Sequence, residues 1–116
     1  MTRLNVKFYP LEGENNSPVE FLLSLDAKSL TTIQKHLEKF AEIAHEEWPR
    51  SWSKKHTGPI RQTTCGDFRA LFIVDPPYMV ILHIFRKKGR KTHPGDTARA
   101  ENNYEAYLND PRRSNP

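Results

Sequence analysis

The apolar run at residues 78–85, with the sequence YMVILHIF, constrains the fold more than any other stretch. It is as long as an ordinary strand and far shorter than the roughly 20 apolar residues that a membrane-spanning helix needs. A strand that is apolar at nearly every position has to be covered on both of its faces. The run therefore predicts a central strand in a sheet that has other elements packed on each side.

Further strands precede this run in the sequence. Turns at residues 66–67 and 75–77 separate it from two more strands, which are predicted over residues 60–65 and 68–74. Residues 4–9 alternate between apolar and polar side chains and predict another strand near the N-terminus. Within the strand at 68–74, the same period of two gives one face four apolar side chains: Phe68, Ala70, Phe72 and Val74.

Three helices are predicted. Residues 17–20, SPVE, form a capping box in which Ser17 accepts a hydrogen bond from the amide of Glu20 and the Glu20 side chain bonds back, so a short helix follows. Residues 28–47 carry apolar side chains at helical spacing and predict a longer helix, which we interpret as scaffold. Pro94 opens a last helix with its cap near residues 92–93.

Hairpin-linked strands and segregated helices predict an α+β domain. We expect an antiparallel or mixed β-sheet that is packed by two N-terminal helices and one C-terminal helix. The 116 residues are enough for one domain with its own core. We place this single domain at residues 1–108, interpret residues 48–58 as a basic connection, and expect a disordered polar tail at residues 109–116.

The residues that the chain lacks exclude several classes of protein. A single cysteine, Cys65, rules out an internal disulfide framework and a Cys-rich zinc site. The five histidines are scattered without metal-ligand spacing, so we expect neither a metal nor another cofactor. The chain also lacks an apolar run that could cross a membrane and an N-terminal secretory signal, so we expect a soluble cytoplasmic protein.

Charge is distributed unevenly along the chain. Residues 1–47 carry five basic and eight acidic side chains, whereas residues 48–116 carry thirteen basic and six acidic ones. The densest basic segment is RKKGRK at residues 86–91, which favours binding to a polyanion because each contacted phosphate releases counterions. A solvated turn without a partner is the alternative. The candidate RNA- or phosphate-binding side chains are Lys54, Lys55, Arg61, Arg86, Lys87, Arg90 and Lys91.

Three stretches of the sequence resemble the motifs of one toxin superfamily. They are VKFY at residues 6–9 followed by SPVEFL at 17–22, FRALF at 68–72, and ILHIFRKK at 81–88 with Lys91-Thr92 and Pro94 after it. The first resembles an opening strand and helix start, the second an aromatic-Arg-x-x-aromatic strand, and the third an "LLH-x-F-x-KK-x-x-KTP" signature. Together they resemble the RelE/ParE toxin superfamily, and within it most closely the phage-derived HigB-like toxins.

The resemblance implies a RelE-like fold and a function. It implies the toxin of a type II toxin–antitoxin pair, a metal-independent endoribonuclease that cleaves mRNA on the ribosome and inhibits translation. The implied partners are mRNA, the ribosome and a cognate antitoxin, often one with a helix-turn-helix domain. Residues 61–64, RQTT, stand where the family carries W-E-L-R. This difference leaves two alternatives: a DNA gyrase inhibitor of the same fold, and a degenerate phage-derived domain that only binds a partner.

Metal-free RNA cleavage sets the chemistry that the implied site has to perform. The 2′-hydroxyl of the substrate is the nucleophile, so the site needs a base for that hydroxyl, cations for the phosphorane and an acid for the leaving 5′-oxygen. Arg69, Lys88 and Tyr104 are the catalytic candidates. His83 and His56 are the candidate general bases, because histidine titrates near neutral pH.

Each of these residues also has a structural interpretation. Arg69 can pair with a carboxylate on the surface of the sheet, and Lys88 can belong to a solvated turn. Tyr104 can pack in the core, as can His83 inside its apolar strand. His56 can be an exposed loop residue. The sequence alone leaves these alternatives open.

Overall fold

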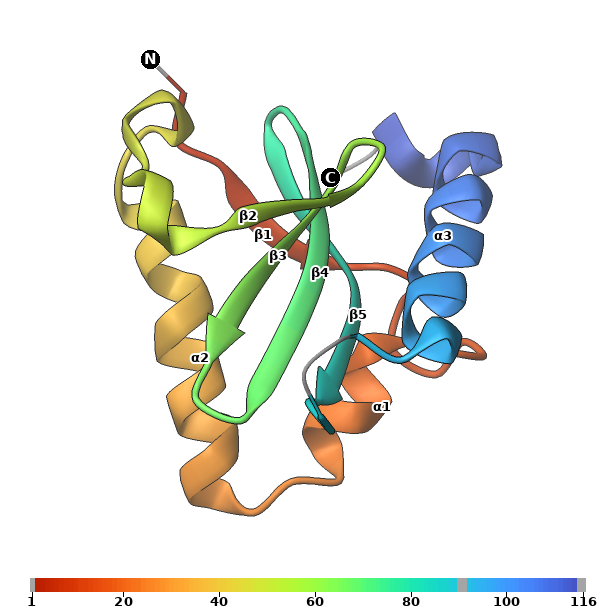
Figure 1. Ribbon diagram of the computed structural model, residues 1–116. Coiled ribbons are helices and arrows are strands. Elements are labelled where there is room, and N and C mark those ends of the chain that lie inside the picture. Colours follow the sequence, from red (N-terminus) through yellow and green to blue (C-terminus); the bar gives the residue numbers. More distant parts are fainter. Residues whose placement is uncertain (1, 90–91, 115–116) are drawn as a thin grey trace.

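The computed structural model describes residues 2–89 and 92–114 and shows a five-stranded mixed sheet with helices packed on it (Figure 1). The sheet order is β1-β5-β4-β3-β2, in which β1 is parallel to β5 and the other neighbouring strands are antiparallel. The predicted α+β class is confirmed, and the apolar run forms β5 between β1 and β4. The strands are β1 (Asn5–Phe8), β2 (Lys54–Thr57), β3 (Ile60–Cys65), β4 (Phe68–Asp75) and β5 (Tyr78–Arg86).

The helices cover the two faces of the sheet and create two apolar cores. Helices α1 and α2 cover one face, where Phe40 and Phe72 are fully buried with ring centroids 6.0 Å apart. Helix α3 covers the opposite face, where Leu82 and Tyr107 are fully buried. The helices are α1 (Pro18–Leu23), α2 (Ala27–Glu42) and α3 (Pro94–Asn109), and short 3-10 helices cover His45–Glu47, Arg50–Trp52 and Pro111–Ser114.

Two elements differ from the sequence prediction. The predicted connection contains strand β2, whose sequence KKHT has no apolar alternation because it is an edge strand. The long helix ends at Glu42 rather than at residue 47. The indole N–H of Trp48 donates to the carbonyl of Phe40 at 2.8 Å, so a side chain from beyond the helix satisfies a carbonyl of its last turn.

The start of α1 also differs from the predicted capping box. The Oγ of Ser17 accepts from the amide of Val19 at 3.2 Å, and its hydroxyl donates to the carbonyl of Pro10 at 2.7 Å. The carboxylate of Glu20 accepts from the amide of Gly13 at 3.2 Å. The prediction was right about the cap residue and wrong about its partners, because both side chains bind the loop that leads into the helix.

The segment after α3 is bound to the N-terminal loop. The hydroxyl of Tyr9 donates to Asp110 at 2.8 Å, and Arg112 pairs with both Asp110 and Glu14. Burial and this hydrogen bond raise the pKa of Tyr9 to about 12. The sequence predicts a disordered tail over residues 109–116, but the structure has specific contacts as far as Arg112. The last two residues of that predicted tail lie outside the described residues.

The contact between α3 and the sheet gives a test of the fold. Tyr107 is fully buried, and its hydroxyl donates to the carboxylate of Asp75 at 2.6 Å. We expect Tyr107→Phe to lower the free energy of unfolding by about 1–3 kcal/mol, because the carboxylate loses a donor. Urea denaturation followed by circular dichroism measures this loss. Tyr104→Phe, on the same helix, is the control, and equal losses in the two variants would show that the Tyr107 hydrogen bond is not responsible.

Candidate functional site

A hollow of about 590 Å³ lies where β5 ends and α3 begins. We call it the β5–α3 hollow. Its wall is aromatic and aliphatic, and it also holds two cations, two histidines and one carboxylate. Such a mixture can bind an anionic group and exchange protons with it. The lining residues are Phe21, His83, Ile84, Phe85, Arg86, Lys88, His93 and Asp96.

A β-bulge directs His83 into this hollow. Phe72 of β4 pairs with Ile81, but the preceding Leu71 pairs with His83, so Leu82 is the extra residue on β5. Partners across antiparallel strands lie on the same face, and Leu71 belongs to the core that α3 covers. His83 therefore faces α3, whereas strict alternation from Leu82 would place it on the opposite face. Bulges often aim a side chain into an active site in this way.

His83 is held by a carboxylate from the first turn of α3. Its Nε2 lies 2.7 Å from Oδ1 of Asp96, and only 12% of its side chain is exposed. Burial lowers the pKa of His83, although the hydrogen bond and charge of Asp96 oppose this effect. The neutral ring donates from Nε2 to the carboxylate and keeps a lone pair on Nδ1. This arrangement suits a general base whose orientation is fixed by a carboxylate.

Aromatic rings and cations complete the hollow. The ring of Phe85 stacks on His83 with centroids 5.4 Å apart. Arg86 places its guanidinium 4.6 Å from the centroid of Phe68, and the side chain of Lys88 is exposed. Lys87 is half-buried and does not line the hollow. The other two predicted cations of this segment, Arg90 and Lys91, lie outside the described residues.

Arg69 lies beside the hollow on the face that α3 covers. Its register partners are Thr64 on β3 and Phe85 on β5. Its Nη1 donates to the carbonyls of Gly66 at 2.7 Å and Phe68 at 3.0 Å, so carbonyls and not a carboxylate are its partners in the described residues. Its Nε is buried and has no hydrogen-bond partner there. The positive charge of Arg69 is therefore not neutralised by an acidic neighbour within residues 2–89 and 92–114.

The candidate site residues on β2 and β3 do not all lie near the β5–α3 hollow. The Nε2 of His56 lies 2.9 Å from the hydroxyl of Thr97, which places His56 beside the first turn of α3. Arg61 donates from Nε to the hydroxyl of Ser53 at 2.9 Å and pairs in register with Lys55. Arg61 shares a face with Phe72, which α1 and α2 cover. Neither Arg61 nor Lys55 lines the β5–α3 hollow.

Tyr104 lies away from the hollow. It is eight residues beyond Asp96 on α3, which is about 12 Å along the helix axis. Its side chain is half-buried and packs against the core between α3 and the sheet. The structure thus places Tyr104 in packing contacts, while His83, Arg86 and Lys88 come together.

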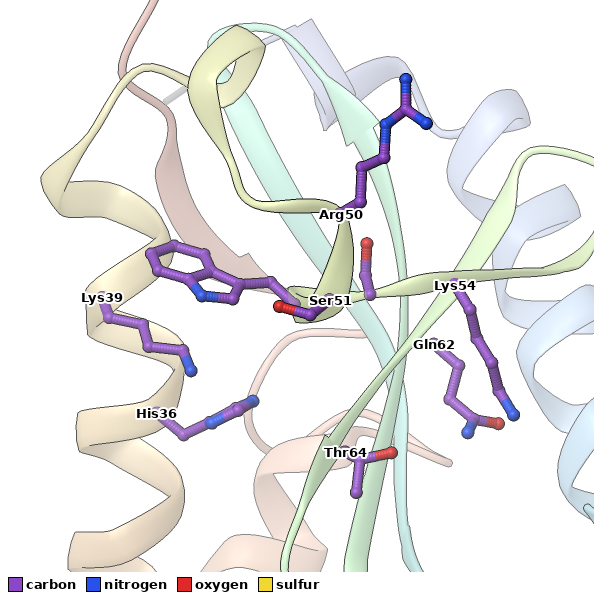
Figure 2. A pocket seen from close by; sticks show the side chains of 9 residues that line it. His36, Lys39, Arg50, Ser51, Lys54, Gln62 and Thr64 are labelled. Atoms are coloured by element: carbon purple, nitrogen blue, oxygen red, sulfur yellow. The ribbon is translucent and has the colours of Figure 1, made fainter.

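A second hollow of about 480 Å³ lies along the outer edge of β3, beside the start of β2 (Figure 2). We call it the β3-edge hollow. Figure 2 shows His36 and Lys39 on α2 on one side of it and Lys54, Gln62 and Thr64 on the other. The sequence pattern predicts a scaffold role for α2 and does not indicate this hollow, because the lining residues come from distant parts of the chain. The lining residues are His36, Lys39, Arg50, Ser51, Trp52, Ser53, Lys54, Gln62 and Thr64.

Hydrogen bonds determine the proton position on His36. The hydroxyl of Thr63 donates to the carbonyl of Trp52 at 2.8 Å, so it has to accept from the Nε2 of His36, 2.7 Å away. Burial, and to a smaller degree the charge of Lys39, lowers the pKa of His36 to about 4. The ring is therefore neutral near pH 7, with its proton on Nε2.

The lowered pKa of His36 predicts a pH dependence of stability. The unfolded chain binds a proton near pH 6.5, whereas the folded chain does so near pH 4, so the free energy of unfolding falls as pH drops between these values. The slope from one group is at most about 1.4 kcal/mol per pH unit, and less here because the ring is only half-buried. We expect His36→Gln, which keeps a donor toward Thr63, to have a shallower slope in urea denaturation from pH 7 to pH 5. An unchanged slope would exclude His36 as its source.

No group of three or more potential metal ligands was found in the described part of the chain. Among the same residues, no helix is both long and apolar enough to cross a membrane.

No protein-family model and no curated protein matches the sequence.

Proposed function

We propose that this chain is the toxin of a type II toxin–antitoxin pair, a RelE/HigB-like endoribonuclease that cleaves mRNA on the ribosome without a metal. The resemblance of the three sequence motifs suggests this class of protein. The structural observation that carries the proposal is the His83–Asp96 pair, which lies in a hollow that Arg86 and Lys88 also line. A base and cations are what metal-free phosphodiester cleavage requires.

The proposed reaction begins at the 2′-hydroxyl of the nucleotide before the cut. The Nδ1 of His83 takes the hydroxyl proton, and the 2′-oxygen attacks the adjacent phosphorus. The bond from phosphorus to the 5′-oxygen breaks, which leaves a 2′,3′-cyclic phosphate on one product and a 5′-hydroxyl on the other. Asp96 holds the ring while it carries the proton and stabilises the imidazolium that forms.

Cations stabilise the phosphorane in this proposal. Arg69 and Arg86 supply guanidinium groups, which match the geometry of phosphate oxygens. The exposed ammonium of Lys88 gives a proton to the leaving 5′-oxygen. In the same proposal the protein acts in the cytoplasm, and a cognate antitoxin, with a helix-turn-helix domain as in many such pairs, covers this surface.

A DNA gyrase inhibitor of the same fold is the second candidate. Gln62 and Thr64 favour it, because the resembling nucleases carry an acidic residue and an arginine at these positions. Gln62 is buried and its Oε1 accepts from the hydroxyl of Thr92 at 3.2 Å, so the neutral side chain serves a structural contact.

Two assays with purified protein distinguish these functions. In an active translation reaction, we expect full-length reporter mRNA to disappear, and to persist when initiation is blocked. Gyrase supercoiling of a plasmid is expected to continue at the same protein concentration. Intact mRNA together with inhibited supercoiling would replace the nuclease by the gyrase inhibitor. Intact mRNA with normal supercoiling would leave a domain that only binds a partner.

A further inference from the structure

The β3-edge hollow has the charge of a site for a polyanion. Lys39, Arg50 and Lys54 line it, and the described residues that line it include no carboxylate. None of these three cations forms an ion pair within residues 2–89 and 92–114. The side chain of Lys54 is exposed, and Figure 2 shows it beside Gln62 on the opposite side of the hollow from Lys39, whereas Arg50 points away. Lys39 and Lys54 are therefore the two cations that can each contact a phosphate of a strand bound along this hollow.

The aromatic ring in this hollow, that of Trp52, already contacts other side chains of the protein. The Nζ of Lys39 lies 4.8 Å from the ring centroid of Trp52, and Phe40 packs edge-on against the same ring at 5.1 Å. A base that stacked on Trp52 would have to displace these contacts. The hydroxyls of Ser51 and Thr64 are on exposed residues. Ammonium and hydroxyl donors without a free aromatic face suit phosphate and sugar oxygens better than a base.

The β3-edge hollow lies close to the β5–α3 hollow on the sheet. Thr64, Arg69 and Phe85 are register partners on three successive strands, and Thr64 lines the β3-edge hollow while Phe85 lines the β5–α3 hollow. Two strand spacings separate Thr64 from Phe85, which is about 10 Å. Arg69, which forms no ion pair with any residue that the structure describes, lies between them. One extended strand of nucleic acid can therefore reach both hollows across Arg69.

We propose that the β3-edge hollow binds the sugar-phosphate backbone of single-stranded RNA next to the nucleotide that occupies the β5–α3 hollow. This inference rests on the proposed function, and it assigns Lys39 and Lys54 as phosphate contacts and Thr64 as a sugar or phosphate contact. Its contribution is affinity and strand orientation, not chemistry or base selection.

Binding of a short single-stranded RNA with 2′-O-methyl groups tests the site, because the blocked 2′-oxygen prevents cleavage. Fluorescence anisotropy over a salt series is the measurement. We expect Lys39→Gln/Lys54→Gln to weaken binding about tenfold and to reduce the slope of log K against log salt by about 1.4, for two lost phosphate contacts. Lys28→Gln/Lys35→Gln removes the same charge from exposed positions of α2 and is expected to change affinity less than about twofold.

Further variants separate the possible failures. Lys54→Gln alone, at an exposed position, keeps the test valid if the double variant unfolds, and a loss of about threefold is then expected. If Lys39→Gln/Lys54→Gln binds like the α2 control, or if wild-type protein does not bind the oligonucleotide, the site is not an RNA site. If wild-type protein leaves translated mRNA intact but binds the oligonucleotide through Lys39 and Lys54, the nuclease proposal fails and the RNA site stands.

Discussion

His83→Gln is expected to lower the rate of mRNA cleavage by about 10²- to 10⁴-fold, the usual contribution of a general base. Glutamine keeps an N–H that can donate to Asp96, so the contact between β5 and α3 survives, but it has no nitrogen lone pair with which to take the 2′-hydroxyl proton. The cleavage rate in a translation reaction and the melting temperature of the variant are measured together. A large loss of rate at nearly constant stability is the expected result.

His56→Gln is the matched control for this prediction. His56 is the other candidate base, and its Nε2 contacts the hydroxyl of Thr97 rather than a carboxylate. We expect the variant to cleave at close to the wild-type rate. Normal cleavage by His83→Gln together with a large loss in His56→Gln would transfer the role of base to His56.

The pH profile of cleavage adds a readout that a purely structural role of His83 would not change. The base has to be neutral, and burial lowers the pKa of His83 below its usual 6.5. We therefore expect the wild-type rate to be flat around neutral pH and to fall only in more acidic solution. The residual rate of His83→Gln is expected to lack this fall.

Arg69→Ala is expected to lower the cleavage rate by about 10²- to 10³-fold, because it removes one preorganised donor to a developing negative charge. The cost in stability is smaller, because the hydrogen bonds that are lost join Arg69 to carbonyls of its own turn at Gly66 and Phe68. Rate and free energy of unfolding are measured on the same preparations.

Two further variants show whether a loss of rate in Arg69→Ala comes from the guanidinium group or from the loss of charge. Arg69→Lys keeps the charge without the planar guanidinium, so partial recovery of the rate is expected. Arg3→Ala removes a charge from an exposed position near the N-terminus and is expected to leave cleavage unchanged. If Arg69→Ala cleaves like Arg3→Ala, Arg69 stabilises the β3–β4 turn and takes no part in the reaction.

The parts of the fold that sequence predicts are those with strong local patterns. The apolar run of β5 and the alternation in β4 identify a covered central sheet, and Pro94 with His93 marks the start of α3, where the Nδ1 of His93 accepts from the amide of Gly95 at 3.0 Å. Strand β2, KKHT, has no such pattern, because it lies at the edge of the sheet and none of its residues is buried. The end of α2 depends on Trp48, a tertiary contact that helical periodicity does not contain.

The candidate site was predictable only in part. His83, Arg86 and Lys88 lie within six consecutive residues at and just after the end of β5, so one motif could identify them. The face that His83 occupies depends on the bulge opposite Leu71, and its partner Asp96 comes from a helix across the hollow. The β3-edge hollow combines α2 with β2 and β3, and no local signal could have brought these segments together.

Mapping of mRNA 5′ ends in a cell-free translation reaction decides whether this chain cleaves mRNA. The reaction is run with wild-type protein, with His83→Gln and without protein. We expect new 5′-hydroxyl ends at ribosome-occupied codons with wild-type protein and few or none with His83→Gln. Unchanged 5′ ends in all three reactions, while translation continues, would contradict the assignment of this chain as an mRNA endoribonuclease.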